Sequence, residues 1–186
     1  MRICSTNEAT DEENKKKMEG LNQKIATVKA LNNNKTLFLS SDDVANGLTN
    51  ILPLCKGAKV MFKKNLNVSR GLVNGSIGMI WGLTNDYVPM TPVCNTWYRS
   101  GVLCSRIQLP LVVCWACTIH KSQGLTLSFM MLDAGKSEFA LGLLYVALSR
   151  VPDIESLCLV VSLTLDRLNS VRKSKQFVSN VQYIIG

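Results

Sequence analysis

A nearly uninterrupted apolar run at residues 109–119 limits the possible folds of this chain more than any other sequence feature. A strand buried on both faces of a sheet has this pattern, so we expect such a strand at 111–119, followed by a polar loop at 120–124. Further segments of the same kind come next: apolar strands at 127–132 and 157–161, with a helix at 139–151 between them. Because strands that alternate with helices favour a mainly parallel sheet, we expect an α/β fold.

The N-terminal segment continues the α/β pattern. Residues 2–5 predict a short strand, and Thr6 or Asn7 can cap a helix that runs to Leu21. Acidic side chains lie early in that helix and lysines late, as the helix dipole favours. The prediction is completed by a short strand at 37–39 and a basic helix at 167–175.

A different pattern occupies the middle of the chain. Residues 58–62 alternate between the two faces of a strand, a loop ending in Asn74-Gly75 follows, and apolar side chains then alternate at 77–81. Asn-Gly is a strong hairpin signal, and short strands separated by Gly and Pro favour a small antiparallel barrel. The expected domains are an α/β domain at 1–54 and 105–186, and an inserted barrel at 55–104.

The net charge of +8 is concentrated in the middle third of the chain. Residues 54–125 carry eight basic side chains and one acidic one, whereas residues 1–53 are neutral. A surface that faces a polyanion and a solvated basic face kept for solubility both explain this excess. No run of eighteen apolar residues and no secretory leader are present, so we expect a soluble intracellular protein without a membrane partner.

The seven cysteines include a C-x-x-C pair, Cys114 and Cys117, with His120 three residues later. If the apolar run is one strand, the two thiols point to opposite faces of the sheet. That geometry places them neither on one metal ion nor in an unstrained disulfide. We therefore expect buried structural cysteines in a reducing compartment, and no metal site.

The sequence Gly135-Lys136-Ser137 resembles the end of a phosphate-binding loop. That loop has the pattern G-x-x-x-x-G-K-[ST], and its first glycine position is occupied here by Met130. We therefore expect a surface turn. For the same reason, Asp133 is expected to cap a helix rather than to bind magnesium.

Two segments carry the side chains most suited to a ligand. The loop 118–124 leaves a buried strand with hydroxyl, imidazole, ammonium and amide groups, which suit phosphate oxygens and sugars. A polar loop without a ligand is the alternative. Arg150 ends an apolar helix, where it either complements the helix dipole or presents its guanidinium to a phosphate. Residue chemistry alone leaves both alternatives open.

Both segments resemble the Pif-type (petite integration frequency) 5′-to-3′ DNA helicases of superfamily one. The strings TIHKSQGLTL at 118–127 and YVALSRV at 145–151 are similar to helicase motifs V and VI. CSTN at 4–7 is similar to motif IV, and the segments GAKVMFKKNL at 57–66 and RGLVNG at 70–75 resemble the inserted Src-homology-3-like barrel of the family. The resemblance implies a second RecA-like motor domain with helices on both faces of its sheet.

The resemblance also implies roles for particular residues. Arg150 is expected to be the arginine finger at an ATP site, where it neutralises charge on the transferred phosphoryl group. Gln123 and Gly124 are expected at the nucleotide, coupled to the DNA strand. Single-stranded DNA contacts are expected at Thr6, Asn7, Lys63, Lys64, Asn65, Arg70, Thr118, His120, Lys121 and Ser122.

The phosphate loop and the magnesium-binding acids of such a helicase are not found in this sequence. ATP and Mg²⁺ are therefore expected only together with a missing N-terminal motor domain, and the chain alone is expected to be inactive. The alternatives are a non-enzymatic single-stranded-DNA-binding fragment, an inactive remnant, and a nucleotide hydrolase acting through Lys136. The resemblance implies DNA repair, recombination and telomere maintenance, in the nucleus or mitochondrion; it does not set the oligomeric state.

Overall fold

The computed structural model describes residues 1–34, 42, 44–81, 90–135 and 142–164. The chain forms two compact units, which consist of residues 1–15 with 115–186 and of residues 16–114. The division falls within helix α1 (Asn7–Glu19). No helix in the described part is long and apolar enough to cross a membrane.

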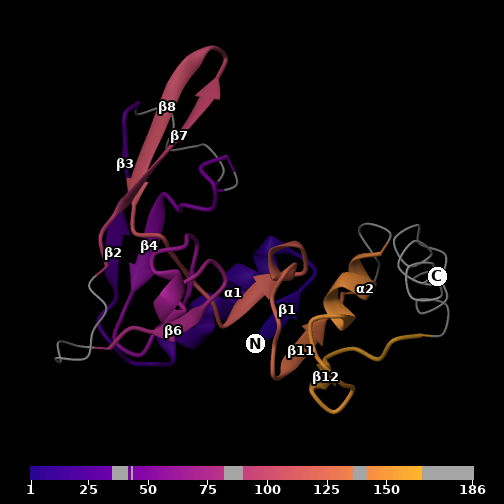
Figure 1. The fold of residues 1–186 in the computed structure, drawn as a ribbon. Helices are drawn as coiled ribbons and strands as arrows, with labels where there is room; N and C mark the ends of the chain where they lie inside the picture. Colours follow the sequence, from indigo (N-terminus) through magenta and orange to yellow (C-terminus); the bar gives the residue numbers. More distant parts are fainter. Residues whose placement is uncertain (35–41, 43, 82–89, 136–141, 165–186) are drawn as a thin grey trace. The chain divides into compact units, whose positions relative to one another are not determined.

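The first unit contains a four-stranded parallel sheet in the order β10-β1-β11-β12. Its strands are β1 (Arg2–Cys4), β10 (Ala116–Thr118), β11 (Met130–Asp133) and β12 (Leu157–Leu159). The short helix η3 (His120–Ser122) follows β10, and α2 (Leu143–Leu148) lies beside the sheet in Figure 1. The expected α/β fold with a parallel sheet is confirmed.

Helices α1 and α2 contact opposite faces of this sheet. Ile3 and Leu132 are fully buried in a core that includes Leu144 of α2. The neighbouring residue Arg2 points to the other face, where it contacts Glu13 of α1. Alternation of side chains along β1 therefore explains why apolar and polar residues of this strand meet different helices.

Helix α1 begins as the sequence predicts. The Thr6 hydroxyl oxygen accepts a hydrogen bond from the backbone N–H of Ala9, at 3.2 Å, and so satisfies a free donor of the first turn. The helix ends at Glu19, shortly before Gly20, with Lys16 and Lys17 in its last turn.

The second unit contains three antiparallel sheets among its described residues. They have the orders β2-β4, β3-β8-β7 and β6-β5-β9. The strands are β2 (Ala26–Lys29), β3 (Leu31–Asn32), β4 (Ile51–Leu54), β5 (Lys59–Phe62), β6 (Ile77–Met79), β7 (Val93–Arg99), β8 (Val102–Gln108) and β9 (Leu111–Val113), and the helix η2 spans Val68–Arg70. The boundaries predicted for an inserted barrel at 55 and 104 stay a prediction, as does its Src-homology-3-like form.

The single strand predicted at 111–119 is wrong. The segment divides into β9, which pairs antiparallel with β5, and β10, which pairs parallel with β1. The backbone N–H of Cys114 still bonds Lys59, but that of Trp115 bonds the side chain of Asn14. The Asn14 side chain therefore replaces a strand as the partner at this point, so that the pairing of β9 with β5 ends and the pairing of β10 with β1 begins.

The apolar side chains that alternate at 77–81 do not face a core, as such a pattern predicts, but are exposed. Ile77, Met79 and Trp81 are 41%, 55% and 63% exposed. Asn74 and Gly75 lie near the end of a long connection between β5 and β6, and Gly75 has a φ of 90°. They do not form the two-residue hairpin turn that the Asn-Gly pair predicts. The two-residue turn lies elsewhere, at Ser100-Gly101 between β7 and β8.

The strand predicted at 37–39, the helix predicted at 167–175 and the Lys136-Ser137 part of the glycine turn lie outside the described residues.

All seven cysteines are free thiols, and Cys114 is buried. Burial raises the pKa of the Cys114 thiol to about 11.

Candidate nucleic-acid interface

Three neighbouring strands of the first unit end side by side. Cys4 of β1 is in register with Thr118 of β10 and with Asp133 of β11. Two backbone hydrogen bonds extend the ladder past these ends, from Ile119 to Cys4 and from Ser5 to Asp133, each at 3.1 Å. The loops that follow the three strands therefore leave the same edge, where open parallel sheets bind ligands.

The loop 118–124 presents some of its side chains to solvent and uses others to hold its shape. His120 and Lys121 are exposed, whereas Thr118 is 6% exposed and Ser122 is fully buried. The Ser122 hydroxyl donates a hydrogen bond to the carbonyl of Ile119 at 2.7 Å. Ser122 therefore closes the turn that exposes the imidazole and the ammonium group.

Gln123 and Gly124 end this loop, and both are exposed. Gly124 has a φ of 82°, a left-handed conformation that favours glycine. A Cβ atom at Gly124 meets no atom within 4 Å, so the backbone conformation alone requires glycine here.

The segment after β1 lies at the same edge. Thr6 and Asn7 are exposed, although the Thr6 hydroxyl already caps α1. Gly135, after β11, has a φ of 65° and packs so closely that a Cβ atom there lies 2.7 Å from the Ser5 Oγ. The loops that follow β1 and β11 are therefore in direct contact.

Two polar side chains, Asn14 and Arg2, hold in place the strands that end at this edge. The Asn14 side-chain oxygen accepts hydrogen bonds from the backbone N–H groups of Trp115 and Ala116, at 3.0 and 2.8 Å. Its amide nitrogen donates to the Ala116 carbonyl at 3.0 Å. Asn14 thus fixes the start of β10, the strand that leads into the loop 118–124.

Arg2 joins β1 to α1 and β11 through two carboxylates. Its guanidinium contacts Glu13 at 2.8 Å and Asp133 at 2.7 Å. The hydrogen bond with Asp133 raises the pKa of Arg2, against the opposing effect of burial. Asp133 is therefore engaged by Arg2, and its predicted helix-capping role is not seen among the described residues.

Arg150 lies just after the end of α2. Its Nε donates to the Val146 carbonyl at 2.9 Å and its Nη2 to the Ser149 hydroxyl at 2.8 Å. The third contact reaches outside the helix, from Nη1 to the Leu125 carbonyl at 3.3 Å. The guanidinium therefore bonds one carbonyl and one hydroxyl at the helix end and also contacts the residue after Gly124.

The predicted contact residues of the second unit lie on the connection between β5 and β6. Lys64 donates to the Asn95 side chain at 3.1 Å, and the Asn65 side chain accepts from the Asn74 N–H at 2.8 Å. Arg70 is exposed at the end of η2, and Lys63 is half-buried. These hydrogen bonds give a basic connection of defined shape.

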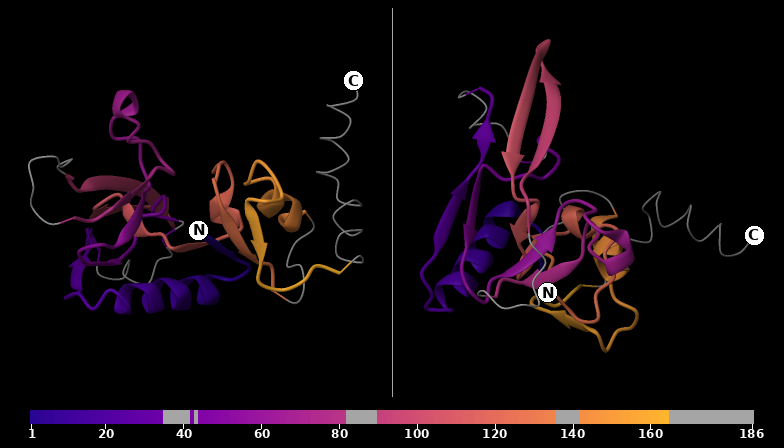
Figure 2. Two further views of the ribbon diagram at one scale, coloured as in Figure 1. Left: turned by 90° about the horizontal axis from the view of Figure 1, so that it is seen from below. Right: turned by 60° about the vertical axis from the view of Figure 1, so that its left-hand side comes forward.

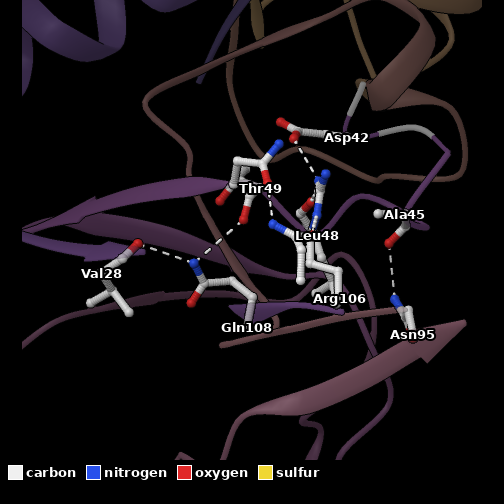
Figure 3. A network of polar contacts seen from close by, with 10 residues as sticks. Val28, Asp42, Ala45, Leu48, Thr49, Asn95, Arg106 and Gln108 are labelled. Carbon is white, nitrogen blue, oxygen red and sulfur yellow. Dashed lines mark hydrogen bonds and ion pairs between the residues drawn. The ribbon is translucent and has the colours of Figure 1, made fainter. Parts of the chain in front are cut away.

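A buried arginine organises the second unit and was not anticipated from the sequence. Arg106 of β8 is fully buried and contacts the Leu48 carbonyl at 2.7 Å, the Asn32 side chain at 3.0 Å and Asp42 at 3.3 Å. Its guanidinium also lies 5.8 Å from the centre of the Trp97 ring. Figure 3 shows Arg106, Gln108 and Asn95 joined to the segment 42–49 and to Val28. Burial lowers the pKa of Arg106, partly offset by Asp42.

The structure thus brings together the predicted residues of the first unit and, separately, those of the second. The first group contains Thr6, Asn7, Thr118, His120, Lys121, Ser122, Gln123, Gly124 and Arg150. The second group contains Lys63, Lys64, Asn65 and Arg70. In the described part of the chain, no three His, Cys, Asp or Glu side chains form a group that could hold a metal ion.

Comparison with known proteins gives consistent matches. A family model described as "DNA helicase Pif1, 2B domain" matches residues 38–83. The human ATP-dependent DNA helicase PIF1 is 35% identical over 170 residues, which are 84% of this chain and 26% of the human protein. The chain therefore spans about a quarter of the length of this relative.

Two solved structures share the fold. The crystal structure of Pif1 helicase from Candida albicans has a TM-score of 0.73 and 24% identity, over 98% of this chain and 49% of that chain. Pif1 helicase from Bacteroides, in complex with ADP-AlF3 and ssDNA, has a TM-score of 0.63 and 23% identity, over 99% of this chain and 44% of that chain.

Proposed function

Because this chain belongs to the Pif1-type helicases, we propose that it forms the second motor domain of an ATP-dependent 5′-to-3′ DNA helicase. In this role it binds single-stranded DNA and supplies an arginine to an ATP site. The phosphate loop and the magnesium ligands of that site belong to another motor domain. The name of the human relative and the complex of the Bacteroides protein support this assignment.

The observation that carries the proposal is a hydrogen-bonded path from the exposed loop to Arg150. The Leu125 N–H bonds the Ser122 carbonyl at 3.0 Å, and the Leu125 carbonyl accepts from Arg150. The Leu127 N–H then bonds the Arg150 carbonyl at 2.8 Å. A change in the loop can therefore reach Arg150 through two adjacent contacts.

In the first unit, His120 and Lys121 contact the DNA strand directly. Both are exposed at the carboxyl edge of the sheet, next to Thr6 and Asn7. Thr118 is 6% exposed and Ser122 is fully buried, so these two residues act by shaping the loop and not as direct contacts of the strand. Gln123 and Gly124 connect this loop to the nucleotide.

In the second unit, Lys63, Lys64, Asn65 and Arg70 contact phosphates. Residues 54–81 and 90–114 of this unit carry six basic side chains that are exposed or half-buried and no acidic one, which favours a polyanion over a neutral ligand. Phosphate contacts of this kind position a strand without reading its sequence. We further propose that the inserted domain extends over 55–104, and that the protein acts on DNA in the nucleus or mitochondrion.

Arg150 acts on the transferred phosphoryl group of ATP. A planar guanidinium with permanent charge stabilises the charge that develops in such a transfer. Its present contacts with Val146, Ser149 and Leu125 are neutral acceptors. A phosphate oxygen forms stronger, charge-assisted hydrogen bonds, so exchange of acceptors is favourable once nucleotide is present.

The proposal is tested by binding of the chain to fluorescent oligo-dT at several salt concentrations. We expect affinity to fall steeply between about 50 and 200 mM salt, because counterions are released from the phosphates. Lys121→Ala should reduce the slope of log affinity against log salt by about 0.7. Lys24→Ala removes the same charge from an exposed position that is not among the proposed contacts and should leave the slope unchanged.

Three results contradict the proposal or replace it. No binding at low salt favours an inactive remnant. Salt-dependent binding that Lys24→Ala and Lys121→Ala weaken equally indicates attraction to net charge without a site. ATP hydrolysis by the chain alone, abolished by Lys136→Ala, identifies an autonomous hydrolase.

A further inference from the structure

The hairpin β7–β8 is the most regular element of the second unit. Its two strands pair over seven positions, from Val93 opposite Gln108 to Arg99 opposite Val102. Ser100 and Gly101 connect them with φ values of 49° and 77°, which is the two-residue turn that matches strand twist. In Figures 1 and 2 the hairpin extends beyond the other strands of this unit.

One face of the hairpin is anchored to the rest of the unit. Asn95, Arg106 and Gln108 are each less than 9% exposed and hydrogen-bond to other segments, as Figure 3 shows. Cys104 on the same face is 3% exposed. These contacts hold the base of the hairpin rigidly, so the tip has a defined position within its unit.

The opposite face of the same sheet has no charged side chain. Tyr98 and Leu103 lie opposite each other near the tip and are 75% and 51% exposed. Strand alternation and register place seven residues on this face: Leu31, Cys94, Thr96, Tyr98, Leu103, Ser105 and Ile107. Thr96 and Ser105 separate Tyr98 and Leu103 from the exposed Ile107 and Leu31. Exposed apolar side chains on a rigid element are typical of a binding surface.

The surrounding charge selects the kind of ligand. Residues 54–81 and 90–114 of the same unit carry six basic side chains that are exposed or half-buried, Arg99 among them, and no Asp or Glu. An exposed aromatic ring in a unit with this basic excess suits a ligand that combines flat apolar faces with negative charge. Single-stranded nucleic acid has both properties, since its bases stack on aromatic side chains while its phosphates attract basic ones.

We propose that Tyr98 is a stacking platform for a base of single-stranded DNA, with Leu103 supporting the ring across the strand pair. This site rests on the proposed DNA-binding function, but Tyr98 and Leu103 are not among the residues assigned there. Stacking on a single aromatic ring accepts any base, so the site adds affinity without sequence preference.

The test compares oligo-dT with an abasic oligonucleotide of the same length, which keeps the phosphates and lacks the bases. Tyr98→Ala should weaken oligo-dT binding by about 5- to 150-fold and leave abasic binding unchanged. Tyr98→Phe keeps the ring and should bind as the unmodified chain does. Ile154→Ala removes another side chain of high exposure, 83%, and should have no effect on either ligand.

The outcomes separate this site from the proposed function. If the unmodified chain binds neither oligonucleotide, the DNA-binding function fails, and this site fails with it. If it binds oligo-dT and Tyr98→Ala does not weaken that binding, only the stacking site is wrong. An equal loss of affinity for both oligonucleotides also overturns it, because stacking requires the bases.

Discussion

The Nη1 atom of Arg150 donates a hydrogen bond to the carbonyl oxygen of Leu125, at 3.3 Å. This contact joins the end of α2 to the residue that follows Gly124, at the end of the exposed loop 118–124. The position of the Leu125 carbonyl depends on the backbone of Gly124, which has a φ of 82°. The backbone conformation at one glycine therefore bears directly on the position of Arg150.

Gly124→Ala is expected to weaken the coupling between DNA and Arg150. A Cβ atom at this position meets nothing within 4 Å, so the substitution acts through φ alone and costs about 1 kcal/mol. The measurement is the stimulation of ATP hydrolysis by saturating oligo-dT, in a protein that joins this chain to the phosphate-loop motor domain of a Pif1 relative. Gly57→Ala is the matched control, with a φ of 84° and ordinary contacts to Leu21 at 3.6 Å. Equal stimulation in the two variants would contradict the expected coupling.

Arg106→Ala is expected to destabilise the second unit strongly. The substitution leaves the Leu48 carbonyl and the Asn32 side chain without their buried donor, and it removes the contact with Trp97. Because the Asp42 side chain is 39% exposed and can be rehydrated, we expect a loss of about 3 kcal/mol in the free energy of unfolding.

Urea denaturation followed by tryptophan fluorescence measures this loss. Arg99→Ala removes an exposed arginine from the same hairpin and is expected to change the free energy of unfolding by less than about 0.5 kcal/mol. A similar loss in the free energy of unfolding for Arg106→Ala and Arg99→Ala would show that the buried hydrogen bonds of Arg106 contribute little to stability.

Cys114 is expected to make stability fall in alkaline solution. Its folded-state pKa is raised from 9.0 to about 11 by burial. Below pH 9 both states hold the proton; between pH 9 and 11 the unfolded chain releases it and the folded chain does not. The free energy of unfolding therefore falls as pH rises, by roughly 2 to 3 kcal/mol in total.

Denaturation of the unmodified chain and of Cys114→Ala across pH 8 to about 11 isolates this contribution. The difference in the free energy of unfolding between the unmodified chain and Cys114→Ala should shrink as pH rises, because the variant has no buried thiol to keep protonated. Cys94→Ala removes an exposed thiol and should retain the fall in stability seen in the unmodified chain. A pH-independent difference between the unmodified chain and Cys114→Ala would show that this thiol titrates alike in both states.

Asn14→Ala is expected to loosen the strand that leads into the loop 118–124. The substitution removes the acceptor for the Trp115 and Ala116 amides, so hydrogen exchange at these two amides should become faster. Asn14→Asp keeps the acceptor and should preserve most of their protection. Unchanged exchange in Asn14→Ala would show that this strand start is held by other contacts.

The α/β part of the fold could be predicted because its signals are local. The strand at 2–5, the cap at Thr6 and the strands at 127–132 and 157–161 follow from apolar runs and capping chemistry, and they correspond to β1, the start of α1, β11 and β12. The division of 111–119 into β9 and β10 could not be predicted, since it depends on the side chain of Asn14, about a hundred residues away in sequence. A contact at such a separation leaves no periodic pattern.

The candidate site shows the same distinction. The exposed His120 and Lys121 follow a buried strand, as the polar loop after an apolar run indicates. The buried Arg106 could not be found in this way, because a lone arginine in an alternating segment normally lies on the solvated face. Only the facing carbonyl and side-chain oxygens of the segment 42–49 and Asn32 make its burial favourable.

The most direct test of the central claim is ATP hydrolysis by the two-domain protein described above, with and without oligo-dT. The account predicts DNA-stimulated hydrolysis that Arg150→Ala lowers by about 10³-fold or more, with Arg150→Lys only partly active, because lysine lacks the planar fork. Nucleotide binding measured separately should persist in both variants. Hydrolysis that is stimulated by DNA and unchanged in Arg150→Ala would contradict the assignment of this chain as the domain that supplies the arginine.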